Sequence, residues 1–152
     1  MTGTSEPQVT VGIVFGGANS EHEVSCSSAR GVLANLDSAR FEAVLVKIGR
    51  DGRWQRVDSI DDPVDAGSAL PDLNGLDVIL PVLHGRFGED GTVQGLFELA
   101  GVPYVGCGVL SSALAMDKIM AQRVLSASGL PTVPTVGVTA WTRDTAASDA
   151  AT

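Results

Sequence analysis

The stretch "VTVGIVFGGANSEHEVS" (Val9–Ser25) decides the fold class. Its first seven residues are mostly apolar and β-branched, which is typical of a strand buried on both faces of a parallel sheet. Gly16 and Gly17 interrupt this run. Ser20, with Glu23 three positions later, then forms a capping-box pattern that predicts the start of a helix. A buried strand followed at once by a helix indicates an α/β domain.

Three more stretches have the composition of strands. Residues 41–48 ("FEAVLVKI") and 76–85 ("LDVILPVLHG") are apolar runs, and 102–108 ("VPYVGCG") is a shorter one that ends in glycines. Between the first of these and a further strand-like run, Asp51–Gly52 is a strong hairpin pattern, because this pair readily adopts the positive φ angles of a tight turn. The sequence therefore predicts several parallel strands and one hairpin.

Helical patterns alternate with these strands. The apolar stripe of the first helix includes Val24 and Leu33, and a second helix within residues 89–101 stops at Gly101. Residues 111–129 carry a longer pattern that predicts one continuous helix. This order predicts an α/β fold with three layers, in which helices flank an open, mostly parallel, Rossmann-like sheet.

Two segments do not fit the repeating order. Residues 58–75 contain five aspartates and two prolines, and we expect an exposed, solvated excursion. Residues 133–141 ("VPTVGVTAW") have the composition of one more strand, without a partner left in the sequence.

Composition narrows the possible functions. The 152 residues suffice for a domain with a real core, and the net charge of −8 without Lys and Arg clusters argues against binding a nucleic acid polymer. No apolar run approaches 18 residues, so no membrane span is predicted. Cys26 and Cys107 lack metal-site spacing and are expected to be free thiols. The short polar N-terminus does not resemble a signal peptide, and we expect a cytoplasmic protein.

Chemistry-bearing residues gather after three predicted strands. They occupy residues 16–21, 84–86 and 106–108. In open α/β sheets, ligands bind beyond the carboxyl ends of the strands. We therefore expect these three segments to converge on one site.

The first segment crowds two carboxylates around an imidazole. The capping box accounts for Glu23, whereas Glu21 is either a surface carboxylate that complements the helix dipole or a carboxylate held for a substrate cation. His22 is expected to face solvent. The exposed amides of residues 16–20 could also hold an anion.

The second segment, "LHGRFGEDG", offers two readings. His84 and Arg86 could bind a carboxylate or a phosphate. Alternatively, His84 bonds a backbone carbonyl, and Arg86 pairs with Glu89 or Asp90.

Other site classes are weakly supported. The first turn reads G-G-A-N-S instead of the dinucleotide pattern G-x-G-x-x-G, and the second strand ends near Lys47, without an acid for a ribose. The two histidines are far apart in sequence, which argues against a metal site. No G-x-S-x-G element for a serine hydrolase is present.

Three motifs resemble a known family. "VFGGANSEHEVS", "LHGRFGEDGTVQGLFELAGVPYVGCGVLSSALAMDK" and "GLPTVPTV" are similar to the N-terminal part of D-alanine–D-alanine ligases, which are ATP-grasp enzymes of peptidoglycan synthesis. The resemblance runs from about Val9 to Val138. It implies that residues 1–130 form a pre-ATP-grasp, substrate-binding domain. Residues 131–152 would then be a linker and the first strand of a truncated ATP-grasp central domain.

The resemblance also implies a reaction. ATP phosphorylates the carboxylate of a first D-alanine, and the amine of a second D-alanine attacks the resulting acyl phosphate. Family members use Mg²⁺, whose ligands are implied to lie outside this chain. A cytoplasmic homodimer is implied, without nucleic acid or membrane partners. Because the family's central and C-terminal lobes are missing, we expect the chain alone to be inactive.

Site residues follow from the matching positions. Glu21 matches the glutamate that binds the ammonium of the first D-alanine, and His84 matches the histidine near its carboxylate and the transferred phosphate. Lys118 matches a lysine that reaches the ATP phosphates, although it could equally be a solvent-facing helix lysine. Pocket-shaping roles are implied for Val24, Ser25 and Gly85, and loop-supporting roles for Gly16, Gly17, Arg86, Glu89 and Asp90.

Two alternatives remain open at this point. One is the same lobe in a ligase that uses D-lactate or D-serine as its second substrate, because the residues that select this substrate lie mostly outside the chain. The other is a stand-alone α/β module that binds an anion without catalysis.

Overall fold

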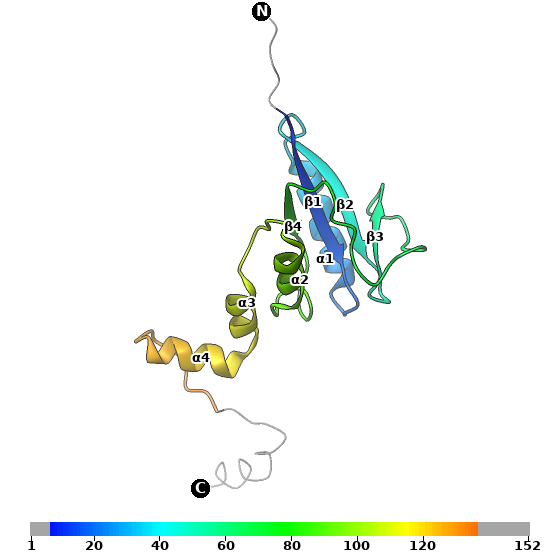
Figure 1. The fold of residues 1–152 in the computed structure, drawn as a ribbon. Coiled ribbons are helices and arrows are strands. Elements are labelled where there is room, and N and C mark those ends of the chain that lie inside the picture. Colours follow the sequence, from blue (N-terminus) through cyan, green and yellow to red (C-terminus); the bar gives the residue numbers. More distant parts are fainter. Residues whose placement is uncertain (1–6, 137–152) are drawn as a thin grey trace, which may run out of the picture. The chain divides into compact units, whose positions relative to one another are not determined.

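The computed structural model describes residues 7–136 (Figure 1). The chain divides into two compact units, Met1–Ala113 and Leu114–Thr152. The elements, in chain order, are β1 (Val9–Gly16), α1 (His22–Asn35), β2 (Phe41–Ile48), β3 (Trp54–Val57), β4 (Val78–Pro81), α2 (Thr92–Ala100), α3 (Val109–Met116) and α4 (Lys118–Ala127).

The four strands of the first unit form one sheet in the order β3-β2-β1-β4. β1 lies between β2 and β4 and is parallel to both, with Gly16 level with Ile48 at the carboxyl ends. β3 runs antiparallel to β2 and closes the predicted hairpin, in which Gly52 has a φ of 82°. The mostly parallel sheet and the hairpin at Asp51–Gly52 are therefore confirmed.

Helices α1 and α2 cover opposite faces of this sheet. On one face, Ile13 and Phe15 of β1 pack with Cys26 and Ala29 of α1. On the other face, Val14 packs in a cluster that includes two residues of α2, Val93 and Phe97. Because side chains alternate along a strand, β1 supplies both cores. The three-layer α/β arrangement is confirmed.

The predicted start of α1 is wrong in its local detail. The helix begins at His22, its N-cap residue is Glu21, and no side chain caps it. Ser20 lies in the preceding turn, and Glu23 forms an ion pair with Arg50 instead of closing a capping box. The Asn19 carboxamide accepts the Glu21 N–H (2.9 Å), so an Asx turn takes the place of the predicted cap.

The prediction of a single helix over residues 111–129 is also wrong, because the helix is interrupted at Asp117. This residue has extended ψ (98°), and its carboxylate accepts the N–H groups of Ile119 (3.1 Å) and Met120 (3.0 Å). An aspartate at this position competes with helix continuation by capping a new helix. Helix α3 therefore ends at Met116 and α4 begins at Lys118.

The predicted strand over residues 102–108 is reduced to one isolated bridge between Tyr104 and Ile79. Ile79 N–H bonds Pro103 O, and Val105 N–H bonds Ile79 O, both at 2.8 Å. Pro103 has no N–H to extend the ladder, and Gly106 turns away with a φ of 130°. The apolar run at 76–85 likewise contributes only the four residues of β4.

The acidic segment 58–75 is largely exposed, as expected, but it is anchored to the sheet. Ile60 and Leu73 are buried, and the buried Lys47 ammonium donates to Ile60 O (2.8 Å) and Asp62 O (2.6 Å). A simple solvated excursion is therefore wrong for this segment. Of the strand predicted over 133–141, residues 133–136 form none, and 137–141 lie outside the described residues.

Within residues 7–136, no helix combines the length and the apolar character that crossing a membrane requires.

Candidate functional site

The loops that follow β1 and β4 lie side by side at the carboxyl edge of the sheet, as the sequence predicts. Asn19 of the first loop bonds the backbone of the second, 65 residues further along the chain. The third predicted segment, 106–108, behaves differently. Its backbone bonds forward to the start of α3, where Ser112 N–H donates to Gly108 O (3.0 Å). The structure thus joins two of the three predicted segments.

The turn after β1 requires glycine. Gly16 and Gly17 have φ angles of 93° and 123°, which favour glycine. A Cβ at position 16 would lie 2.2 Å from Ile48 O, at the end of the neighbouring strand. Gly17 N–H also donates to Ile48 O (2.9 Å). These glycines place the following residues directly above the sheet edge.

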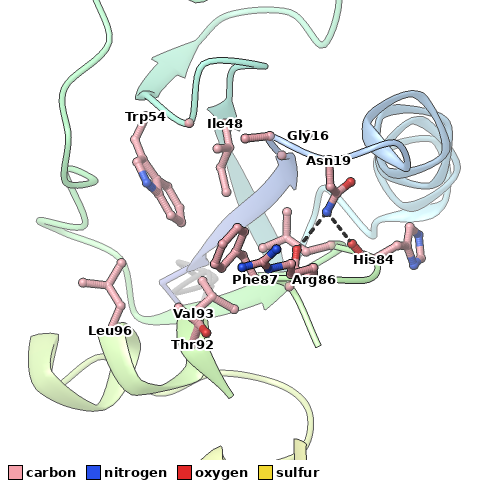
Figure 2. Close-up of a pocket in the computed structure, with 15 residues that line it drawn as sticks. Gly16, Asn19, Ile48, Trp54, His84, Arg86, Phe87, Thr92, Val93 and Leu96 are labelled. Atoms are coloured by element: carbon pink, nitrogen blue, oxygen red, sulfur yellow. Dashed lines mark hydrogen bonds between the residues drawn. The ribbon is translucent and has the colours of Figure 1, made fainter. Parts of the chain in front are cut away.

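Asn19 clamps the two loops together. Its amide nitrogen donates to the carbonyls of His84 and Arg86, both at 2.9 Å (Figure 2). Its oxygen accepts the Glu21 N–H. Asn19 was not among the residues predicted for the site from the sequence. An asparagine two positions after a glycine pair is typical of an Asx turn and could have signalled it.

Glu21 lies against the second loop at Gly85. A Cβ on Gly85 would fall 1.9 Å from Glu21 Oε2, so only glycine leaves room for the carboxylate there. Gly85 also has a φ of 67°. Glu21 is exposed, and its carboxylate joins none of the ion pairs or hydrogen bonds found in residues 7–136. This carboxylate is therefore available to a ligand.

His22 is buried, so the expectation that it faces solvent is wrong. Only 6% of its surface is exposed, and its Nδ1 lies 2.8 Å from Gly17 O. The ring satisfies a carbonyl that the glycine turn removes from the sheet ladder. The buried His22 ring therefore stabilises the turn after β1 through its bond to Gly17 O.

Ser25 and Val24 occupy opposite environments. The Ser25 hydroxyl is fully buried, accepts the Gly16 N–H (2.8 Å) and donates to Val82 O. It joins the ends of β1 and β4. Val24, at the preceding position of α1, is exposed. Ser25, one of the three residues with an implied pocket-shaping role, thus acts here through the loops it holds.

His84 points its ring toward α1. Its Nε2 lies 3.1 Å from the Ser28 hydroxyl, and Figure 2 shows the ring turned away from Trp54 and Leu96. The side chain is half-buried, and its carbonyl is held by Asn19. Ser28 was not predictable as a partner of His84, because a serine within a helix has no distinctive sequence pattern.

Glu89 and Asp90 both accept hydrogen bonds from the backbone of the second loop. Glu89 Oε2 accepts the Gly85 N–H (2.6 Å), while Asp90 accepts the N–H groups of Phe87 (2.8 Å) and Thr92 (3.1 Å). Burial is the largest single influence on Asp90 and opposes its ionisation. The bonds from Phe87 and Thr92 together outweigh burial, so the pKa of Asp90 lies below its ordinary value.

Arg86 makes no ion pair with Glu89 or Asp90, so that alternative is wrong. Its guanidinium lies 4.7 Å from the centre of the Phe87 ring. Phe87 itself has a φ of 68° and is about half exposed. A phenylalanine in this conformation is uncommon and marks local strain in the loop.

An apolar cavity of about 300 Å³ opens beside the clamped loops (Figure 2). Its walls come from the turn after β1, the β2–β3 hairpin, the second loop and α2. Glu21 is not among its lining residues, so the cavity and the free carboxylate are separate features. The side chains that line it include Ile48, Trp54, Leu83, Phe87, Val93 and Leu96.

Lys118 belongs to the second compact unit, where it opens α4. Its side chain is exposed, and its ammonium donates to Ala115 O (3.1 Å).

Cys26 and Cys107 are free thiols, as predicted, and burial raises the pKa of Cys26. In the part of the chain that the structure describes, no three His, Cys, Asp or Glu side chains gather to hold a metal ion.

Comparison with known proteins places this chain in a family. The family model described as D-ala D-ala ligase N-terminus matches residues 10–107. The D-alanine–D-alanine ligase of Corynebacterium diphtheriae is 45% identical over 82% of this chain and 42% of its own length. The corresponding ligase of Rhodococcus opacus is 44% identical, over 84% of this chain and 43% of its own length. The chain therefore spans less than half the length of these curated relatives.

Solved structures of D-alanine ligases are also similar to this chain. The VanG D-Ala:D-Ser ligase of Enterococcus faecalis superposes with a TM-score of 0.79 at 33% identity, covering 94% of this chain and 48% of the other. The D-alanine–D-alanine ligase of Coxiella burnetii gives 0.73 at 31% identity, covering 84% and 44%. Together with the family model, these matches show that the chain belongs to the family defined by the N-terminal domain of D-alanine–D-alanine ligases.

Proposed function

We propose that this chain supplies the part of a D-alanine–D-alanine ligase that holds the first D-alanine. The observation that carries the proposal is the free carboxylate of Glu21, which lies against Gly85 between the two clamped loops. An exposed carboxylate without a partner suits the ammonium of an amino acid.

The neighbouring residues fit the other end of such a substrate. D-alanine is a zwitterion, so its carboxylate needs a donor close to the group that receives its ammonium. His84 stands on the same loop as Gly85, and we propose that its imidazole faces the substrate carboxylate and the phosphate transferred to it. Val24, exposed one helical turn after Glu21 on α1, would contact the substrate methyl group or shape the pocket around it.

ATP would supply the phosphoryl group that turns the first carboxylate into a reactive acyl phosphate. Lys118 fits a phosphate-binding role in chemistry, because its ammonium is exposed at the first residue of a helix. Mg²⁺ finds no ligand cluster in residues 7–136, so we propose that its ligands lie in the portion of the relatives that this chain does not span.

The remaining features of the parent protein are proposals of the same kind. We propose a cytoplasmic homodimer that contributes to peptidoglycan synthesis. A domain boundary near residue 130 stays a prediction, with a central ATP-grasp domain beginning at residues 131–152. Because this chain covers only 42% of a relative's length, we expect it to be inactive without the rest.

A D-Ala–D-Ser ligase is the second candidate. The observation in its favour is the superposition on the D-Ala:D-Ser ligase of Enterococcus faecalis, with a TM-score of 0.79. Both candidates bind D-alanine at the first site, so the residues described here serve either one.

Phosphate release from ATP tests the proposal. The longest reading frame that contains this chain should release phosphate when D-alanine is added and should not respond to L-alanine. Mass spectrometry of the product with mixed D-alanine and D-serine then separates the two candidates. A folded, ATP-binding protein without any D-alanine dependence would refute both.

A further inference from the structure

The carboxamide of Asn19 bonds both halves of the proposed site at once. Its oxygen accepts the Glu21 N–H (2.9 Å), and its nitrogen donates to His84 O and Arg86 O (2.9 Å each). One side chain thus fixes the backbone of the residue proposed to bind the ammonium. It also fixes the backbone on both sides of Gly85.

The three bonds use three of the four hydrogen bonds that an asparagine side chain can make. Its two N–H donors meet two carbonyls, and its oxygen meets one N–H. An aspartate would keep the acceptor but lose both donors, and it would direct a carboxylate at two carbonyl oxygens. A serine or an alanine is too short to reach both loops. No other residue type of similar size offers this combination.

The position of the Glu21 carboxylate depends on the distance between the loop after β1 and the loop that contains Gly85. Glu21 Oε2 occupies the space that a Cβ on Gly85 would fill, so the two loops are in close contact there. On the far side, Glu89 holds the Gly85 N–H, and Ser28 meets the His84 ring. Asn19 is the side chain that ties this loop to the Glu21 backbone.

From this arrangement we propose that Asn19 is a positioning residue, which sets the distance between the Glu21 carboxylate and the His84 loop and thereby the affinity for the first D-alanine. The inference rests on the proposed function. Asn19 acts through Glu21 and His84 and contacts no reacting atom.

The test uses Asn19→Asp and Asn19→Ala in the full-length ligase. Both should raise the KM for D-alanine at the first site at least tenfold and leave the KM for ATP within about twofold. A purely structural role would instead lower the active fraction, and so kcat, without changing the first-site KM. If Asn19→Ala does not fold, Asn19→Ser serves, because its hydroxyl still accepts the Glu21 N–H without bridging both carbonyls.

Asn35→Asp is the matched control. Asn35 also donates its amide to a backbone carbonyl, that of Gly31 (2.8 Å), at the far end of α1. This variant should leave both KM values unchanged.

Amide hydrogen exchange gives a second readout that does not depend on activity. The Glu21 N–H should exchange faster in Asn19→Ala and stay protected in Asn19→Asp, which keeps the acceptor. An unchanged first-site KM in folded, active Asn19 variants would overturn the inference. Failure of the proposed function looks different, because the unmodified ligase would then show no response to D-alanine, and the positioning role would fall with it.

Discussion

Helices α1 and α4 both begin after an acidic residue, yet the two carboxylates behave differently. Asp117 turns its carboxylate back onto its own helix and accepts two of the first N–H groups of α4. The Glu21 carboxylate makes no bond to α1 and lies instead against Gly85, a residue of another loop. The difference shows that the same charge at a helix start can serve the helix or be left free for a ligand.

The reason lies partly in the side chains and partly in the surroundings. Aspartate is a favoured N-cap because its short side chain reaches the N–H groups of the next residues, whereas glutamate is longer. At α1, Asn19 has already taken the Glu21 N–H, and the second loop fills the space beside the helix start. The start of α4 depends on its own sequence, and the start of α1 depends on tertiary contacts.

The largest effect should come from Glu21→Gln in the full-length ligase. It would remove the charge-assisted bond that we propose between Glu21 and the substrate ammonium. Such a bond contributes about 1.5–3 kcal/mol, so first-site D-alanine binding should weaken by about tenfold to a hundredfold. ATP binding should be nearly unchanged. Steady-state kinetics with varied D-alanine and ATP measure both, and an unaltered D-alanine response would remove the ammonium role.

Ser25→Ala should remove the hydrogen bonds that join the turn after β1 to the residue after β4. The buried hydroxyl joins the Gly16 N–H to Val82 O, and its loss leaves both groups unsatisfied. We expect the free energy of unfolding to fall by about 1–3 kcal/mol. Urea denaturation measures this, with Ser27→Ala, an exposed residue of the same helix, as the control. Equal stability of the two variants would contradict the bridging role.

Asp117→Ala should act on α4 alone. It removes a side chain that caps two N–H groups, and we expect a local loss of about 1 kcal/mol. Hydrogen exchange of the first turn of α4 should report the loss, whereas amides of α1 should not change. Asp117→Asn keeps an acceptor and should restore most of the protection. Equal protection in Asp117→Ala and the unmodified chain would show that the cap is dispensable.

Glu23→Ala should have the smallest effect. Its carboxylate pairs with Arg50 at the surface, where such pairs contribute about 0–1 kcal/mol and are screened by salt. Stability and first-site KM should both stay close to those of the unmodified ligase. If this variant is folded and inactive, the roles assigned to Glu21 and Glu23 must be exchanged.

The parts of the fold that depend on neighbours in sequence were predictable. Gly101 ends α2 in the left-handed conformation, with its N–H bonded to Glu98 O, and Asp51–Gly52 closes the hairpin. The Asp117 cap could also have been predicted from the sequence, but the helical periodicity of residues 111–129 favoured one continuous helix. These features need only a few consecutive residues.

The buried face of α1 was not predictable in the same way. Its buried residues are His22, Ser25, Cys26 and Ala29, while the apolar Val24 is exposed. A hydrophobicity pattern places valine inside and histidine outside. Here the turn after β1 presents a carbonyl and an N–H that need polar partners from the helix, which reverses that preference.

The sequence by itself determined the strand–turn–helix order and the three-layer class, because apolar periodicity and glycine turns act over a few consecutive residues. It also offered Glu21 and His84 as candidates, through their places after predicted strands and the motifs that resemble the ligase family. The tertiary structure alone decided which carboxylate remains free, where the two histidines point and how Asn19 connects the loops. The bridge made by Asn19 and the orientation of His84 depend on bonds between segments 65 and 56 residues apart, whose partners are set by the register of β1 between β2 and β4. The His22 ring bonds Gly17 O, five residues away, in a turn that is itself held by Ile48 at the end of β2.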